Sequence, residues 1–236
     1  LGTYGFANQF ALGNRLADDF VVSDPAGWRI DGITFFAYQT DAPAAPSTIT
    51  GVYYQVWDGP PNDAGSSVVW GNLTTNRLIG SAWTNAYRTI DTDLHWSNRP
   101  VMANRAGAGF VLPPGTYWLD WTTGGTLPSG PWAPPITVLG QAATGNAMQF
   151  LDAWAPALDV DSGTAQGLPF TIEGVAAQVP AAVVYLPGVL RGFPILPGVP
   201  VLDPIDNADG DGSYTVSWSP ASRAESYTLE EAAAPD

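Results

Sequence analysis

The amino-acid sequence predicts an all-β protein whose main part, residues 1–178, is a jelly-roll-like double-sheet β-sandwich. Three observations carry this prediction. The 26 glycines and 22 prolines among 236 residues are spread between short apolar runs, a pattern typical of many short strands joined by turns. No apolar pattern of helical period is longer than two turns. A hydrophobic content of 45% is enough for a real core.

Short apolar or alternating runs mark the strands of this sandwich. Turn-forming residues separate them, for example the sequences DGPPN at 58–62, PPG at 113–115 and SGP at 129–131. So many short strands in one region favour a jelly roll. The predicted strands are residues 19–22, 28–39, 49–57, 68–70, 78–81, 87–91, 108–112, 116–122, 135–139, 147–150 and 169–175.

Two of these runs carry information about the layers. The third predicted strand alternates so that Val52, Tyr54 and Val56 share one face, while its other face is aromatic rather than charged. Alternation in the second predicted strand slips at Gly32, which predicts a β-bulge there. Because that strand is apolar on both faces, it is expected to be a central one.

The remainder of the chain has a different pattern. Residues 179–198 are predicted to be an apolar junction, in which prolines recur and the stretch 182–191 is too apolar for a solvated linker. Residues 199–236 contain two further alternating runs. Each run gathers its large side chains on one face, namely Tyr214, Val216 and Trp218 in the first and Tyr227 and Leu229 in the second.

The tryptophan of the first run facing the tyrosine of the next resembles the core of fibronectin type III-like domains. This resemblance covers roughly residues 197–236, which is less than half of a sandwich of about 100 residues. It implies an incomplete Ig/fibronectin III-like sandwich, whose missing part is expected in another molecule or in the remainder of a longer protein.

The first region resembles a class of uncharacterised secreted bacterial β-sandwich domains. The sequences that carry the resemblance are LADDF at 16–20, WRIDGI at 28–33, VWDGPP at 56–61, GTYW at 115–118 and GPWAPP at 130–135. The resemblance spans about residues 15–175. It implies an extracellular or cell-surface location and a β-sandwich architecture, and it carries over no catalytic residue.

Composition excludes several chemistries. The chain has no cysteine, and all eight basic residues are arginines, so disulfides, thiol nucleophiles, Cys/His zinc sites and lysine Schiff bases cannot form. A formal net charge of −14 repels nucleic acids and favours cations as small partners. The absence of an apolar run of membrane-spanning length predicts no membrane span.

No catalytic residue is expected. The single histidine, His95, is not accompanied by a Gly-x-Ser-x-Gly elbow, and Glu173 is expected at the surface because charged residues are seldom buried. The chain is therefore not expected to be an enzyme.

A cation site is one candidate. Asp18 and Asp19, at the head of the first predicted strand, could help to ligate a hard cation such as Ca²⁺. The acidic stretch 207–212 resembles the start of a calcium loop, but Trp218 occupies the position of the bidentate glutamate, so a turn is the preferred interpretation.

Ten tryptophans also invite a carbohydrate-stacking interpretation, although most aromatic residues of a sandwich are core. The candidate ligand-binding residues are Trp132, Trp57 and Trp121. Trp132 is expected to be the best exposed of them, since prolines on both sides stiffen its loop.

Two hypotheses about function follow. In the first, the chain is a non-catalytic structural or adhesive segment of an extracellular bacterial surface or filament protein, assembled by inter-chain strand complementation or packed on neighbouring domains. Leaving the apolar face of the last two runs in water would forfeit on the order of 10 kcal/mol. The alternative is a carbohydrate-binding module of a secreted multidomain protein, with a polysaccharide as partner. The residues expected to mediate assembly are Val183, Tyr185, Leu186, Tyr214, Val216, Trp218, Tyr227 and Leu229.

Overall fold

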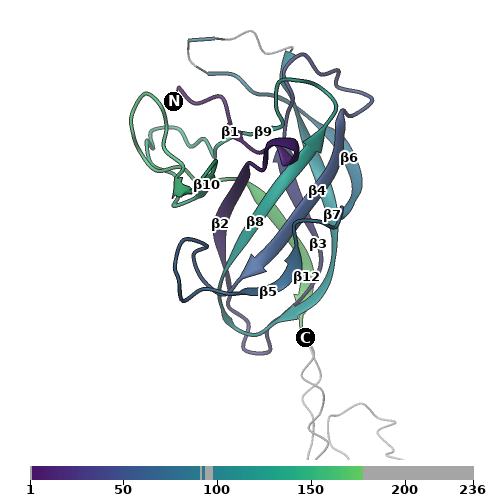
Figure 1. The fold of residues 1–236 in the computed structure, drawn as a ribbon, viewed down its shortest axis with the longest axis vertical. Helices are drawn as coiled ribbons and strands as arrows, with labels where there is room; N and C mark the ends of the chain where they lie inside the picture. Colours follow the sequence, from purple (N-terminus) through teal and green to yellow (C-terminus); the bar gives the residue numbers. More distant parts are fainter. Residues whose placement is uncertain (1, 91, 94–97, 178–236) are drawn as a thin grey trace, which may run out of the picture. The chain divides into compact units, whose positions relative to one another are not determined.

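The computed structural model describes residues 2–90, 92–93 and 98–177, all of which lie within the compact unit Leu1–Pro180. This part of the chain is an all-β sandwich of antiparallel sheets (Figure 1), which confirms the predicted fold class. The predicted junction and the fibronectin-like segment, residues 179–236, lie outside the described residues.

Six strands form one layer of the sandwich and four form the other. The order in the first sheet is β11 (Trp154–Pro156), β10 (Met148–Phe150), β2 (Arg15–Val22), β8 (Gly115–Gly125), β4 (Ile49–Trp57) and β5 (Val68–Asn72). The order in the second is β12 (Phe170–Ala176), β3 (Trp28–Ala37), β7 (Pro100–Leu112) and β6 (Leu78–Tyr87). A two-stranded ladder pairs β1 (Phe6–Ala7) with β9 (Trp132–Ala133), and a 3-10 helix, η1, covers Phe10–Leu12.

The path of the chain between the layers is that of a jelly roll. Strands β2, β4 and β8 belong to the six-stranded sheet, whereas β3, β6 and β7 belong to the four-stranded sheet. In each sheet, a strand from later in the sequence lies between two earlier strands, as in jelly-roll sandwiches. Strand β8 lies between β2 and β4, and strand β7 lies between β3 and β6. Figure 1 shows β4 and β8 side by side in front, with β3, β7 and β12 behind them.

The core lies between the two sheets. Val52, Tyr54 and Val56 of β4 are fully buried, which confirms the predicted inward face of this strand. They belong to the same apolar cluster as Phe35 of β3. The hydroxyl of Tyr54 donates to the Gly107 carbonyl oxygen at 2.7 Å, so the buried phenol is satisfied.

Gly32 lies at the predicted bulge. The register between β3 and β7 shifts between Ile30 and Gly32, and a side chain at Gly32 would come within 2.9 Å of Arg105 Nη2. Arg105 instead pairs with Glu173 of β12, with 2.7 Å between Nη2 and Oε2. Glu173 is therefore at the surface, and β3 is an inner strand between β12 and β7, both as predicted.

Several predicted strand boundaries are wrong. The strand predicted at 78–81 continues to Tyr87, where the strand predicted at 87–91 was expected to begin, and the one predicted at 108–112 is only the end of β7. These strands continue through polar and small residues because the backbone ladder between β6 and β7 holds them. Residues 135–139 form no strand, since the prolines at and before their start donate no backbone hydrogen bond.

Candidate functional site

A pocket of about 440 Å³ opens at one end of the sandwich, the upper end in Figure 1, where β1 and β9 are labelled. Five separate segments form its walls: the N-terminal residues, the residues after β3, the residue before β7, the loop before β9 with the first residue of β9, and the loop between β11 and β12. The lining residues are Gly2, Thr3, Tyr4, Gly5, Tyr38, Thr40, Arg99, Ser129, Trp132 and Val160.

Backbone hydrogen bonds place Trp132 in this wall. Its N–H donates to the Tyr38 oxygen at 2.8 Å, and the Tyr38 N–H donates to the Trp132 oxygen at 2.9 Å. On its other side β9 pairs with β1, with Trp132 opposite Ala7. The indole Nε1–H donates to Ser129 Oγ at 3.3 Å. The ring is therefore half-buried and held in a fixed orientation, as expected for a presented aromatic side chain.

The glycine before this segment is required by its geometry. Gly130 has a φ of +100°, and a side chain there would lie 2.7 Å from the Trp132 ring. Because residues with a Cβ rarely adopt this conformation, the loop from Ser129 to Trp132 depends on a glycine at this position.

Tyr38 contributes a buried side chain with an unused polar group. The residue is only 2% exposed, it lines the pocket, and its hydroxyl has no hydrogen-bond partner among the described residues. Burial raises the pKa of this hydroxyl, while the guanidinium groups of Arg88 and Arg99 lower it to a smaller extent. The hydroxyl therefore lies within the electrostatic influence of two arginines.

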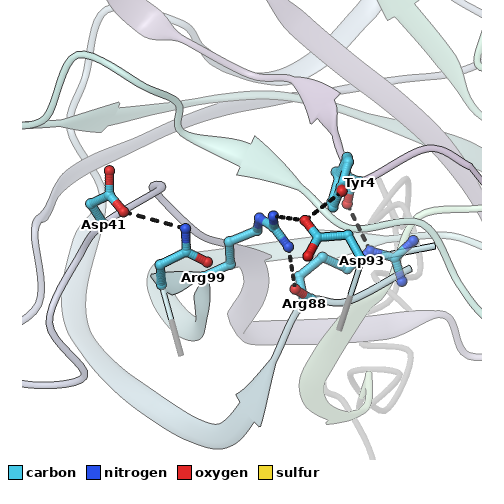
Figure 2. Close-up of polar contacts among 6 residues, drawn as sticks. Tyr4, Asp41, Arg88, Asp93 and Arg99 are labelled. Carbon is cyan, nitrogen blue, oxygen red and sulfur yellow. Dashed lines mark hydrogen bonds and ion pairs between the residues drawn. The ribbon is translucent and has the colours of Figure 1, made fainter. Parts of the chain in front are cut away.

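Arg99 forms the polar corner of the pocket (Figure 2). Its Nη2 lies 2.5 Å from Asp93 Oδ2, its Nη1 donates to the Arg88 oxygen at 3.2 Å, and its guanidinium carbon lies 4.1 Å from the centroid of the Tyr4 ring. The Tyr4 hydroxyl donates to the same Asp93 oxygen at 2.6 Å, and this bond is the main reason that the pKa of Tyr4 is raised. Asp93 thus aligns Tyr4 and Arg99.

Arg88 ties the N-terminal segment to the end of the sandwich. Its Nε donates to the Tyr4 oxygen at 2.7 Å and its Nη2 to the Thr3 oxygen at 2.6 Å. Figure 2 shows this arginine beside Tyr4 and Asp93. Asn98 Nδ2 donates to Asp41 Oδ1 at 3.3 Å, and Figure 2 shows this aspartate on the side opposite Tyr4.

Asp159 anchors the same N-terminal segment from a different loop. Its Oδ1 accepts from the N–H groups of Gly2 and Thr3, both at 2.9 Å, and its Oδ2 accepts from Ser162. Burial opposes ionisation, but these hydrogen bonds together hold the pKa of Asp159 well below its ordinary value. The wall formed by residues 2–5 is therefore fixed at both Arg88 and Asp159.

The other two predicted tryptophans lie elsewhere. Trp121 is 1% exposed, with its ring 5.1 Å from that of Phe35 in the core, so it has no free face for a ligand. Trp57 is half-buried on the outer face of β4, where its Nε1 donates to Asp120 Oδ2 at 3.2 Å. The three predicted tryptophans do not form one site, because Trp121 lies in the core, Trp57 on the outer face of β4 and Trp132 in the pocket wall.

Asp120 links several side chains on that outer face. It is fully buried, and burial raises its pKa despite the nearby Arg15 charge. Its Oδ2 also accepts from Arg15 Nη1 at 2.9 Å and from Gln55 Nε2 at 2.9 Å. Trp57 is thus part of a structural network centred on Asp120.

The two aspartates of the predicted cation site do not converge. Asp18 is 6% exposed on the inner face of β2, where its Oδ2 accepts from the Leu168 N–H at 2.7 Å. Burial raises the pKa of Asp18 to about 6. Asp19 follows it on the strand and therefore points to the opposite face. Within the described ranges, no cluster of three or more acidic, histidine or cysteine side chains is arranged to hold a metal ion.

The remaining predicted residues cannot be placed. His95 and the residues expected to mediate assembly lie outside the described residues; the latter are Val183, Tyr185, Leu186, Tyr214, Val216, Trp218, Tyr227 and Leu229. Conversely, sequence reasoning missed Tyr4, Tyr38 and Arg99. No periodic pattern connects these three positions, and only the proline-flanked Trp132 marked the pocket.

The fold and the pocket define a β-sandwich protein with an aromatic cavity at one end. No protein-family model matches the chain, and no curated protein or solved structure is significantly similar to it. Across the part of the chain that the structure describes, no helix has the length and apolarity to cross a membrane.

Proposed function

We propose that residues 2–177 form a non-catalytic carbohydrate-binding module of an extracellular protein. The observation that carries this proposal is the pocket of about 440 Å³ in which Trp132, Tyr4 and Tyr38 lie around polar donors. Its volume falls in the range of about 300–1,000 Å³ that is typical of small-ligand pockets.

The wall chemistry matches that of a sugar ring. A pyranose has C–H faces that pack on aromatic rings and a rim of hydroxyls that need hydrogen-bond partners. Trp132 offers a rigid indole, and amphipathic aromatic side chains suit a ligand that is apolar on its faces and polar at its edge. Thr40 and Ser129 add hydroxyls to the same wall.

The same residues support binding rather than catalysis. Glycoside hydrolysis uses two carboxyl groups on either side of the scissile bond, and the lining residues that the structure describes include no carboxylate. An extracellular or cell-surface location is part of the proposal. It rests on the resemblance of residues 15–175 to secreted bacterial sandwich domains.

The test is affinity electrophoresis of the full chain in gels that contain different polysaccharides, preceded by a glycan array to select them. Trp132→Ala should weaken binding about tenfold or more, since burial of a large apolar side chain contributes about 1.5–3 kcal/mol. Trp132→Phe should retain part of the retardation, because it keeps an aromatic face.

Trp154→Ala is the matched control. Trp154 is also half-buried, but it contacts Phe150 and Arg15 at the far edge of the six-stranded sheet rather than the pocket. It should leave the retardation unchanged. No retardation of the unmodified chain on any polysaccharide, or equal losses in the two alanine variants, would refute the proposal.

The structural or adhesive role by strand complementation stays a prediction, because the residues expected to carry it lie outside the described residues. Negative-stain microscopy of the purified chain tests it directly. Fibres would support assembly, and uniformly single particles at high concentration would argue against it.

A further inference from the structure

Arg99 is the only charged residue among the described residues that line the pocket. Arg99 lines it with a guanidinium, which has five N–H donors and no acceptor. Arg99 Nη2 donates one hydrogen bond to Asp93, and Nη1 donates one to the Arg88 oxygen. The guanidinium therefore has further N–H groups that these two contacts do not use. Asp93 pairs with this guanidinium, with 2.5 Å between Nη2 and Oδ2, but it is not among the described residues that line the pocket.

Tyr38 adds a second donor beside it. Only 2% of the residue is exposed, and its hydroxyl has no hydrogen-bond partner among the described residues. Because burial raises the pKa of this hydroxyl, it stays protonated and can donate a hydrogen bond.

Ser129 and Thr40 complete the set. Ser129 Oγ accepts the indole N–H of Trp132, and its own O–H can donate to a ligand. Thr40 is positioned by its N–H, which donates to the Ser129 oxygen at 3.1 Å. The hydroxyls can accept as well as donate, whereas the Arg99 guanidinium can only donate, and an ionised carboxylate is an acceptor-only group.

Resting on the proposed carbohydrate-binding function, we infer that the pocket selects a sugar that carries a carboxylate, a uronic acid, over the neutral sugar of the same ring shape. In this arrangement the ring packs on Trp132, and the carboxylate receives hydrogen bonds from Arg99 and the Tyr38 hydroxyl. Charge-assisted hydrogen bonds of this kind are stronger than neutral ones.

The net charge of −14 does not oppose this selection at close range. At physiological ionic strength, charges more than about 8 Å apart are largely screened. A carboxylate in direct contact with Arg99, which is itself 11% exposed in its side chain, is screened much less. The acidic surface therefore affects the approach of the ligand more than the contact.

The experiment is isothermal titration of the full chain with four probes: the methyl glycosides of glucuronic acid and galacturonic acid, and those of glucose and galactose. At least one uronate should bind about tenfold or more tightly than its neutral counterpart, since hydrogen bonds to charged groups contribute about 1.5–3 kcal/mol. The methyl ester of the preferred uronate should bind like the neutral sugar.

Tyr38→Phe removes only the hydroxyl and should weaken uronate binding about fivefold or more. Its effect on the neutral sugar should be smaller, and its melting temperature should match that of the unmodified chain, because no partner in the described structure loses a bond. Tyr117→Phe is the control: Tyr117 donates to the Pro113 oxygen, away from the pocket, and this variant should bind as before.

The two proposals fail in different ways. Equal binding of uronate and neutral sugar, or equal effects of Tyr38→Phe on both, would overturn the carboxylate inference and leave carbohydrate binding standing. If no probe binds and no polysaccharide retards the chain, both proposals are wrong.

Discussion

Replacement of Asp18 by asparagine is expected to stabilise the protein at neutral pH and to change little at acid pH. Asp18 is 6% exposed between the two sheets. Burial raises its pKa from 3.8 to about 6, against the opposing effect of the hydrogen bonds from Leu168 and Asp19. The charged carboxylate is therefore less favourable in the folded chain than in the unfolded one.

The direction of the pH effect follows from proton binding. Between about pH 4 and pH 6 the folded chain holds a proton that the unfolded chain has released, so the free energy of unfolding falls as the pH rises. A shift of about two pKa units corresponds to roughly 3 kcal/mol. The asparagine has no charge and avoids this loss, and its amide oxygen can still accept the 2.7 Å hydrogen bond from Leu168.

The assay is urea unfolding followed by tryptophan fluorescence at pH 4 and pH 7, for the unmodified chain and Asp18→Asn. Between pH 4 and pH 7, the unfolding free energy of Asp18→Asn should rise by roughly 3 kcal/mol relative to that of the unmodified chain. Taking the difference removes the contributions of the other carboxylates. A variant that is less stable at pH 7, or pH profiles that run parallel, would refute the reasoning.

Asp159→Asn provides a comparison of opposite sign. Hydrogen bonds hold the pKa of Asp159 well below its ordinary value, so its ionised form stabilises the fold at pH values above that ordinary value. The contribution is lost as the pH falls. This variant should therefore lose more stability at pH 7 than at pH 3, and a loss that does not depend on pH would contradict the assignment.

Three further substitutions, one of them a control, test the sandwich itself. Asp120→Ala removes a fully buried acceptor of three side-chain hydrogen bonds and should lower the unfolding free energy by about 3 kcal/mol in urea titrations. Asp31→Ala breaks only an exposed pair and should cost less than about 1 kcal/mol; similar losses would contradict the role of burial. Gly27→Ala should lower the melting temperature clearly, because Gly27 has a φ of +81° and a side chain would lie 2.3 Å from the Leu112 oxygen. An unchanged melting temperature would show that the turn relaxes without cost.

Local pattern was enough to predict the central strands. The alternation around Tyr54 identified the inward face of β4, and the slip at Gly32 located the bulge of β3. Both are features of a single strand, since the side chains of a strand alternate between its two faces. The boundary of β7 was missed, because its first residues are held by pairing with β3 and β6 rather than by their own apolar pattern.

The candidate site could be predicted only in part. Proline-flanked Trp132 was singled out from its neighbours in sequence, and the structure places it in the wall of a pocket; its role in ligand binding stays a prediction. Trp121 is also a tryptophan, but it lies in the core. Successive residues of β8 point to opposite faces, and Trp121 is at an inward position. The prolines around Trp132 distinguished it from Trp121, but no sequence feature showed that Trp121 lies on the inward face of β8.

The sequence by itself determined the class of the fold, since the distribution of glycine, proline and alternating apolar residues is a local property of each strand and turn. The pairing of strands and the pocket were decided only by the tertiary structure. Tyr4, Tyr38, Arg99 and Trp132 come from four separate segments. They meet because Arg88, Asp93 and Asp159 bind the N-terminal segment and the loops through hydrogen bonds between residues far apart in the chain. Such bonds join residues that are far apart in the sequence, so no local pattern encodes them.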